Sequence, residues 1–375
     1  MIKIARKAEL RCAITNPSPG LPLTQVSAPV HLLNLYGGYS MRFHFSASSL
    51  TSGMRTAAVA AAFALSSAAW AADDVNVRFS WKLKGEYAHL YLAQEQGMYA
   101  ANNLEVRMGE GAGAPAALGA LLQGQEDVVI MPAIFAVSAI QKGMPVRIIA
   151  LYQPKTPVVL ISQPDKPVLK PQDLEGKTVA HSVGETGTSY LAVFCAVNHI
   201  DCAKVKKVQM DAQSRVPQFL QKQVDVVSVY KNNDLPMIEA RIGTKFPTLD
   251  LSQNGLAIPG LAAVSSNAAI SKKPDVLKRY LAAVNQGIEA TKKDPKAATT
   301  AISKAWKGGP APEVIEAQVR ATMEAIEVKP GKPLGWTDPQ TIAQALELLK
   351  TDEAIGAPKP TDTFFTNDLL TQPKP

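Results

Sequence analysis

Short runs rich in β-branched residues alternate with longer stretches at helical spacing, and this alternation occurs twice along the chain. Its first occurrence has strand-like runs at 75–80, 104–108 and 128–131, and helix-like stretches at 87–101 and 114–122. Its second has strand-like runs at 178–181, 205–210 and 224–230, and helix-like stretches at 189–198 and 213–221. Such alternation is typical of βαβ units, which form parallel sheets with helices on both faces. The sequence therefore predicts two α/β units.

Proline clusters at 153–157 and 258–261 mark the joints between the two units. Each cluster leads into a short apolar run, 158–162 and 261–265 respectively. We predict that these runs are two antiparallel crossing strands, which carry the chain into a second lobe and back. The tail after Ser271 is almost wholly helical in pattern, with an apolar stripe on one face, and we expect it to pack on the first lobe.

An alanine-rich apolar segment precedes the first predicted strand. Arg55 supplies a positive start, residues 56–65 the apolar stretch, and Ala69 and Ala71 the small residues before a cleavage site. This pattern predicts a signal peptide over 41–72 rather than a buried helix, and hence a periplasmic protein. No Cys stands immediately after the apolar run, so we expect a soluble chain without a lipid anchor.

Residues 1–40 lie upstream of the predicted signal and lack an apolar run. We assign them to a non-structural or mis-assigned segment, with Met41 or Met54 as the true start. Cleavage would remove six of the 39 Lys and Arg and one of the 32 Asp and Glu, and would lower the net charge from +7 to +2. A nucleic-acid partner is therefore not expected.

Cleavage would also leave two of the three cysteines, Cys195 and Cys202. An even pair in an oxidising compartment suggests a disulfide, with two buried free thiols as the alternative. Few histidines remain in the mature chain, and no hydrolase or metal-site motif is present. We therefore expect no catalytic residue, no metal and no cofactor.

Several segments of the sequence, taken in their order along the chain, resemble those of one protein family. They are 91–99 with 103–106, 120–129, 142–146, 173–179 and 275–301. The chain is similar to the periplasmic substrate-binding proteins of ABC transporters, in the nitrate, sulfonate, taurine and thiamine-pyrimidine-precursor group. A Gly commonly stands in that family where this chain has Asn103.

The resemblance implies an α/β fold of the periplasmic-binding-protein type (type II), with mixed, largely parallel sheets in two lobes joined by two crossing strands. Lobe 1 would comprise 73–157 plus 264–375, and lobe 2 would comprise 158–263. A small-molecule ligand would bind between the lobes, which close by a hinge motion. The partner would be an ABC permease in the inner membrane, and we expect a monomer.

Ligands of open α/β sheets bind beyond the carboxyl ends of the strands, where loops and helix N-termini expose N–H groups. This rule and the family's cleft select the candidate ligand-binding residues. They are Trp81, Tyr87, His89, Glu110, Gly111, Pro132, Ala133, Tyr152, Glu185, Thr186, Gly187, Thr188, Ser189, Tyr230 and Asn232.

Trp81 and Tyr87 have flat faces suited to stacking on a planar solute, although packing within the lobe is the alternative for each. His89 is equally compatible with a satisfied surface or core position. The glycines at 109–113 allow close backbone approach. Residues 184–190 link a strand to a helix and form the best candidate cradle for an anion or polar group, with ordinary capping by Thr188 or Ser189 as the alternative.

The leading functional interpretation is a non-catalytic binding protein that captures a small polar solute for a permease. Two alternatives remain: a pyrimidine-precursor synthase-like enzyme on the same scaffold, and a solute-sensing domain. The solute itself stays open. Lys82, Lys84 or Lys231 near 186–189 would suit a sulfonate, carboxylate or nitrate, whereas acidic and aromatic candidates would suit a nitrogen heterocycle.

Overall fold

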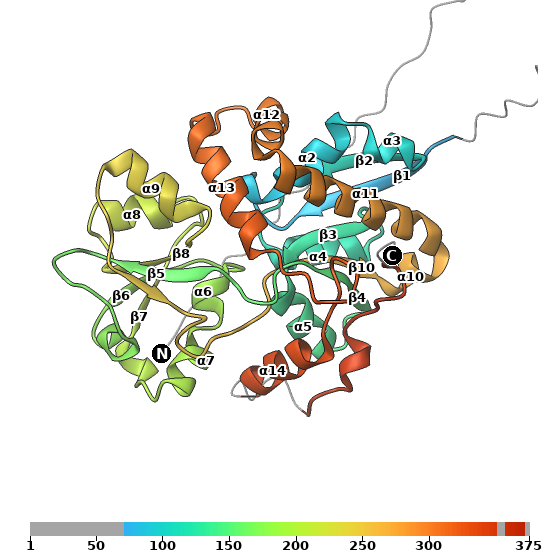
Figure 1. Ribbon diagram of the computed structural model, residues 1–375. Helices are drawn as coiled ribbons and strands as arrows, with labels where there is room; N and C mark the ends of the chain where they lie inside the picture. Colours follow the sequence, from blue (N-terminus) through green and yellow to red (C-terminus); the bar gives the residue numbers. More distant parts are fainter. Residues whose placement is uncertain (1–70, 351–356, 372–375) are drawn as a thin grey trace, which may run out of the picture. The chain divides into compact units, whose positions relative to one another are not determined.

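The computed structural model describes residues 71–350 and 357–371 (Figure 1). Its first strand, β1 (Asp73–Phe79), begins directly after the expected cleavage position. The predicted upstream segment, which contains Cys12, and almost all of the predicted signal peptide lie outside the described residues.

The first sheet has the strand order β2-β1-β3-β10-β4. Its members are β1, β2 (Leu104–Gly109), β3 (Val128–Pro132), β4 (Val146–Leu151) and β10 (Leu261–Ser266). β1 pairs in parallel with β2 and β3, as the βαβ pattern predicts. β10 returns late in the chain and inserts antiparallel between β3 and β4, so the sheet is mixed.

The second sheet repeats this plan with the order β7-β6-β8-β5-β9. Its members are β5 (Val158–Ser162), β6 (Thr178–His181), β7 (Lys206–Gln209), β8 (Val226–Tyr230) and β9 (Thr248–Asp250). β6 is parallel to β7 and β8, and β5 is antiparallel to β8 and β9. The fold class predicted from the sequence is confirmed.

Helices connect and cover the strands. Around the first sheet they are η1 (Gly85–Tyr87), α2 (Ala88–Glu95), α3 (Met98–Ala101), α4 (Ala114–Leu122) and α5 (Ala133–Gln141). Around the second they are η2 (Pro171–Leu174), α6 (Thr186–Ser189), α7 (Leu191–Val197), η3 (Cys202–Lys204), α8 (Arg215–Leu220) and α9 (Asp234–Ile242). The C-terminal tail forms α10 (Asn267–Lys272), α11 (Pro274–Lys293), α12 (Pro295–Ala305), α13 (Pro312–Ala325), α14 (Pro339–Leu349) and η5 (Thr361–Thr363).

The crossing between the sheets lies just before β5 and β10 rather than within them. Backbone hydrogen bonds join the two crossing segments, from Thr156 N to Ile258 O (2.8 Å) and from Gly260 N to Gln153 O (2.9 Å). β10 belongs to the first sheet from Leu261 onward. The lobe boundaries given above stay a prediction.

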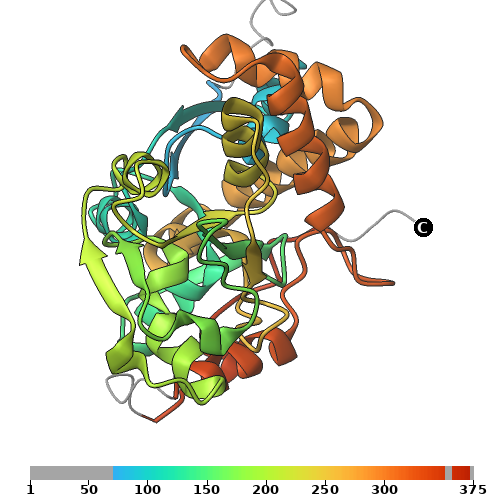
Figure 2. The ribbon, with the colours of Figure 1, turned by 90° about the vertical axis from the view of Figure 1, so that its left-hand side faces the viewer.

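Successive residues of a strand point to opposite faces of its sheet, so each sheet has apolar residues on both faces. In β3, Val129 and Met131 pack with α4 and α5, whereas Val128 and Ile130 pack with α2 and α11. In Figures 1 and 2 the orange helices lie beside the blue strand β1, and of these helices α11 contacts both β1 and β2.

The tail packs mainly on the first sheet, as expected, but it also reaches elements of the second. α11 lies against α2, whereas α13 contacts both η1 and α9, and α14 contacts both α5 and α7. The sequence pattern identified the apolar face of α11, but it did not predict that α13 and α14 also contact elements of the second sheet.

Cys195 and Cys202 form a disulfide, with their Cα atoms 5.5 Å apart. Of the two alternatives predicted, a disulfide or two buried free thiols, the structure has the disulfide. Within 71–350 and 357–371, no helix combines the length and apolar character needed to cross a bilayer.

Candidate functional site

A cavity of about 320 Å³ is lined by segments that follow strands of both sheets. The first sheet contributes Trp81 after β1 and Pro132 at the end of β3, and the second contributes Glu185 after β6 and Tyr230 at the end of β8. Gln153, from a crossing segment, also lines it. The cavity thus lies at the carboxyl ends of the strands, where open α/β sheets bind their ligands.

Two aromatic side chains line the first-sheet side of this cavity. The Tyr87 ring is buried and stacks on Phe79, with centroids 4.2 Å apart and planes inclined by 5°. Burial, followed by the neighbouring Glu86 carboxyl, raises the pKa of Tyr87, so its hydroxyl stays protonated. Trp81 is partly buried and extends the apolar surface. Trp81, the more exposed of the two, offers a flat face suited to a planar group.

Glu185 fills the helix N-terminus that the sequence suggested as an anion cradle. Its Oε1 accepts the Thr188 N–H at 2.5 Å, and its Oε2 accepts the Gly187 N–H at 3.2 Å. The hydroxyls of Thr188 and Ser228 donate to the same carboxylate, and Arg215 Nη1 lies 3.6 Å from it. The protein's own carboxylate therefore takes the donors that an anionic ligand would need there.

Arg215, in the first turn of α8, holds this arrangement against β8. Its Nη1 donates to the Ser228 carbonyl at 2.9 Å and to the Ser228 hydroxyl at 3.3 Å. The side chain is largely buried and lines the cavity, and among the described residues its Nε has no hydrogen-bond partner. Arg215 thus places a positive charge at the cavity wall, and the nearby Glu185 carboxylate balances that charge.

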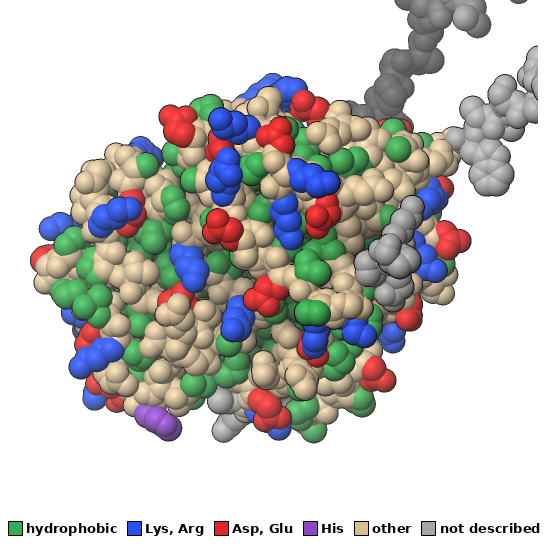
Figure 3. Space-filling view, viewed as in Figure 1, with side chains coloured by type: hydrophobic (Ala, Val, Ile, Leu, Met, Phe, Trp, Pro, Cys, Tyr) green, Lys and Arg blue, Asp and Glu red, His purple; other side chains and the backbone are tan. Residues whose placement is uncertain are grey.

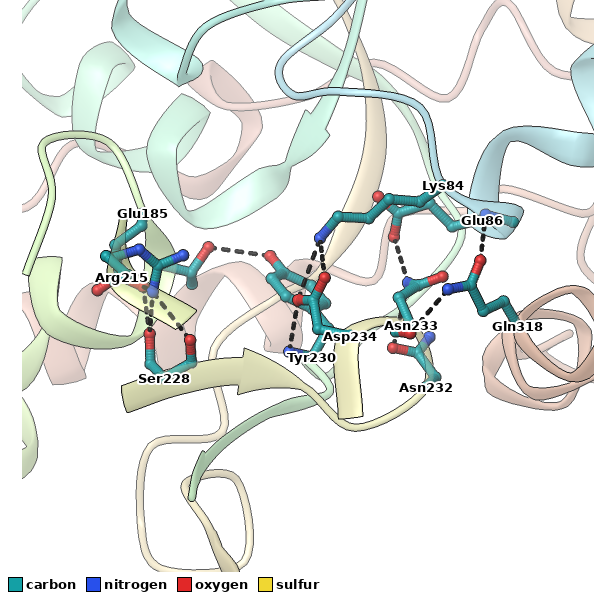
Figure 4. Close-up of polar contacts among 12 residues, drawn as sticks. Lys84, Glu86, Glu185, Arg215, Ser228, Tyr230, Asn232, Asn233, Asp234 and Gln318 are labelled. Atoms are coloured by element: carbon teal, nitrogen blue, oxygen red, sulfur yellow. Dashed lines mark hydrogen bonds and ion pairs between the residues drawn. The ribbon is translucent and has the colours of Figure 1, made fainter. Parts of the chain in front are cut away.

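A second cluster of polar side chains joins the first-sheet side of the cavity to the second-sheet side (Figure 4). Lys84 Nζ lies 3.1 Å from Asp234 Oδ1 and 4.7 Å from the ring centroid of Tyr230. Asn233 Nδ2 donates to Glu86 Oε2 at 3.1 Å. Burial raises the pKa of Glu86, although the nearby Lys84 ammonium opposes this shift.

Charges around the cavity are therefore mostly paired. Lys84 pairs with Asp234, and Arg215 pairs with Glu185. Arg241, on α9, also lines the cavity and is exposed. A cavity with internally paired charges has little free charge to offer a strongly ionic solute.

The structure brings only part of the predicted set together. The predicted residues that line the cavity are Trp81, Tyr87, Pro132, Glu185, Thr186 and Tyr230. The remaining ones lie outside the lining for several different physical reasons.

His89 and Tyr152 point into the core of the first half of the molecule, which is the first sheet with its covering helices. His89 is buried on α2, edge-on to Tyr152 at 6.4 Å, and burial lowers the pKa of its imidazole to about 4. The Tyr152 hydroxyl donates to Asn285 Oδ1 at 3.3 Å. Both side chains pack between elements of the first half, which was the structural alternative considered for His89.

Gly111 and Gly187 allow close approach between parts of the protein. A Cβ atom would lie 2.1 Å from the Phe79 carbonyl oxygen at position 111 and 2.5 Å from Ser228 Cβ at position 187. Glu110 orders the loop after β1 by accepting a backbone N–H from it at 2.7 Å. These residues position the cavity wall without lining it.

The last four predicted residues surround the site. Ala133 begins α5 and donates its N–H to a crossing segment at 2.6 Å. The Thr188 hydroxyl contacts both Glu185 and His181, whereas Ser189 is exposed. Asn232 is buried beside Asn233, whose Nδ2 donates to the Asn232 Oδ1 at 3.3 Å.

Sequence reasoning missed Glu86, Arg215, Ser228 and the α9 side of the cavity. Arg215 starts the helix that follows β7, so the carboxyl-end rule would have found it if applied one turn further. Asp234 and Arg241 lie on a helix that follows β8, at the same edge of the sheet. Ser228 lies within β8, and only the three-dimensional arrangement shows that its side chain meets Glu185.

Two mixed β-sheets are covered by helices and joined by paired crossing segments, with a cavity lined from both sheets. This arrangement defines a protein with the periplasmic-binding-protein fold. Residues 84–298 match the model of the NMT1/THI5-like family, and the chain belongs to that family. The family resemblance predicted from the sequence is confirmed.

One relative is the riboflavin-binding protein RibY of Chloroflexus aurantiacus, 21% identical over 80% of this chain and 86% of the relative. The alkanesulfonate-binding protein SsuA of Xanthomonas axonopodis pv. citri, solved with MOPS, has a TM-score of 0.61 and 15% identity, covering 78% and 98% of the two chains. The nitrate-binding protein NrtA of Synechocystis PCC 6803 has a TM-score of 0.57 and 15% identity, covering 79% and 86%.

Proposed function

We propose that this protein is the solute-binding component of an ABC importer, which takes up a small molecule in the periplasm and delivers it to a membrane permease. The observation that carries this proposal is the cavity between two α/β halves that meet through paired crossing segments. Membership in the NMT1/THI5-like family and the binding proteins among its structural neighbours support it. In this function the two halves close around the solute, and no covalent chemistry is required.

We further infer that the solute is a planar nitrogen heterocycle with little net charge, rather than a sulfonate or nitrate. Trp81 supplies a flat face, Tyr87 lines the same side of the cavity, and Glu185 already occupies the anion cradle. The riboflavin-binding relative fits this class of solute, because riboflavin carries a planar heterocycle. Basic and acidic side chains are interspersed on the face shown in Figure 3, which gives no support to a nucleic-acid partner.

Titration calorimetry with four probes tests the solute class: riboflavin, an aminopyrimidine, an alkanesulfonate and nitrate. We expect at least one heterocycle to bind with micromolar affinity or better, about −8 kcal/mol, and both anions to bind far more weakly. Tight binding of either anion alone would overturn the inferred class.

Trp81→Ala should weaken binding of the heterocycle by about 1–3 kcal/mol, because it removes a stacking face. Trp336→Ala is the matched control, since it deletes an indole that does not line this cavity. Equal affinity of the Trp81 variant and the parent protein in the same titration would remove Trp81 from the site.

Glu185→Gln tests the reason for excluding anions. Arg215 would lose its counter-charge, so affinity for the alkanesulfonate should rise, and the free energy of unfolding should fall by about 1–3 kcal/mol. Glu175→Gln offers a matched control, because that carboxylate pairs with Lys204 on the surface. Unchanged sulfonate affinity in a folded Glu185 variant would contradict the argument.

Native mass spectrometry distinguishes binding from catalysis. A small molecule released unchanged from the purified protein would support the binding function. A covalent adduct or a bound pyridoxal phosphate would instead favour the synthase-like alternative.

A further inference from the structure

Gln318 lies between the two halves of the protein, and the two ends of its side-chain amide bond to different halves (Figure 4). Its Oε1 accepts the N–H of Gly85, in the η1 segment after β1, at 2.9 Å. Its Nε2 donates to the carbonyl oxygen of Asn233, which precedes α9, at 2.8 Å. The side chain is 1% exposed, so both bonds are shielded from water.

Two further contacts cross between the halves beside Gln318. Lys84 pairs with Asp234, and Asn233 donates to Glu86. We call these five residues the interlobe latch: Lys84, Glu86, Asn233, Asp234 and Gln318. Every latch contact is polar, so each group can exchange its partner for water when the halves separate. Such contacts can form and break repeatedly, unlike an apolar core.

Gln318 lies on α13 of the C-terminal tail, and the apolar side chains Ile315 and Val319 of this helix belong to the core of the first sheet. α13 packs against both η1 and α9, the two segments that the amide joins. At Gly85 a Cβ atom would lie 2.5 Å from Gln318 Cβ, so the glycine allows the helix to approach this closely. The packing of α13 on η1 thus positions Gln318 independently of its bond to Asn233.

Gln318 and Asn233 are absent from the cavity lining, whereas Lys84, Glu86 and Asp234 contribute to it. We propose that Gln318 is a positioning residue for solute binding: it holds the two halves together through Asn233 and sets the fraction of protein in the closed arrangement. This rests on the proposed function insofar as the halves open to admit a solute. The apparent dissociation constant then varies inversely with the closed fraction.

The variant Gln318→Glu isolates the bond between the halves. It keeps an oxygen acceptor for the Gly85 N–H but replaces the Nε2 donor with an oxygen that faces the Asn233 carbonyl. Loss of one net hydrogen bond corresponds to a threefold to tenfold change in an equilibrium, to which repulsion between the oxygens adds. Gln344→Glu, an exposed position on α14, is the matched control.

Hydrogen–deuterium exchange on the purified full-length chain, without added solute, reads out the opening. In Gln318→Glu we expect exchange at least about threefold faster in peptides that cover η1 and the start of α9, and unchanged exchange in α11. Gln344→Glu should match the parent protein throughout. Unchanged exchange at both interface peptides would overturn the proposal, and so would uniform acceleration across the chain, which would indicate only lost stability.

Gln318→Met and Gly85→Ala keep the test decisive if the acidic variant does not fold. The first removes both amide bonds at similar length, and the second forces α13 away from η1. Either should accelerate exchange at the start of α9, and protection equal to the parent protein in both would overturn the proposal. Because these measurements need no solute, a failure of riboflavin or an aminopyrimidine to bind would count against the proposed function and not against the latch.

Discussion

At the scale of single residues, Asp225, just before β8, shows how hydrogen-bond donors can hold a carboxylate in its charged form. Its carboxylate accepts the N–H and hydroxyl of Thr178 at 2.9 and 2.8 Å and the ammonium of Lys166 at 2.7 Å. Burial by itself raises the pKa of Asp225, but the donors outweigh it and lower the pKa from 3.8 to about 2. The charged carboxylate thereby ties the start of β6 to the start of β8.

Asp225→Asn should lower the free energy of unfolding at neutral pH by about 1–3 kcal/mol. A depressed carboxyl pKa adds stability above the unfolded value, and that stability is lost as the pH falls from about 3.8 through about 2. Urea titrations of variant and parent protein should therefore differ at pH 7 and converge near pH 2.

Asp165→Asn is the control for this titration, because it removes an exposed carboxylate beside the same Lys166. It should change stability by less than about 0.5 kcal/mol. A pH-independent difference between Asp225→Asn and the parent would show that the charge of Asp225 is not what stabilises the strands.

At the scale of elements, the packing of α11 on α2 depends on one glycine. At Gly287 a Cβ atom would lie 2.5 Å from the His89 carbonyl oxygen and 2.9 Å from Ala93 Cβ. The sequence shows the apolar stripe of α11 but gives no sign that its backbone must come this close to another helix. The same kind of close approach occurs at Gly85, where α13 meets η1.

Gly287→Ala should therefore destabilise the protein by about 1–3 kcal/mol, because α11 must move away from α2. Gly119→Ala makes the same change in α4, where a Cβ atom would meet nothing within 4 Å. That control should stabilise by up to about 1 kcal/mol, since alanine is the better helix former. Chemical unfolding measures both, and equal effects would refute the packing argument.

At the scale of the whole molecule, one apolar core cluster contains residues from both sheets. Ile148 of β4, Leu160 of β5 and Leu346 of α14 all belong to it. The two halves thus share buried surface in addition to the crossing segments. A shared core predicts that the halves unfold together rather than one after the other.

Tryptophan fluorescence and far-UV circular dichroism can test this cooperativity in urea. Trp81, Trp306 and Trp336 all lie in segments that pack around the first sheet, whereas circular dichroism reports both halves. The two probes should give the same midpoint and the same slope. A second transition seen only by circular dichroism would show that the second half unfolds independently.

From the sequence alone one could predict the two α/β units, most of their strands and helices, and the edge of each sheet where the cavity lies. These follow from local periodicity and from the fixed geometry of βαβ units, which short stretches of chain specify. The family and the mixed character of the sheets were implied instead by the resemblance of several sequence segments to known proteins. Trp81, Glu185 and Tyr230 line the cavity because they directly follow or end strands.

Which side chains turn toward the cavity and which turn into the core depends on the packing of the whole chain. Tyr152 directly follows β4, yet its hydroxyl bonds to Asn285. Glu185 caps its own helix, and Ser228 and Arg215 reach the same carboxylate from other elements. Gln318 is far from η1 and α9 in sequence and joins them only after α13 has packed. Contacts between distant segments depend on how whole elements pack, and no local pattern encodes them.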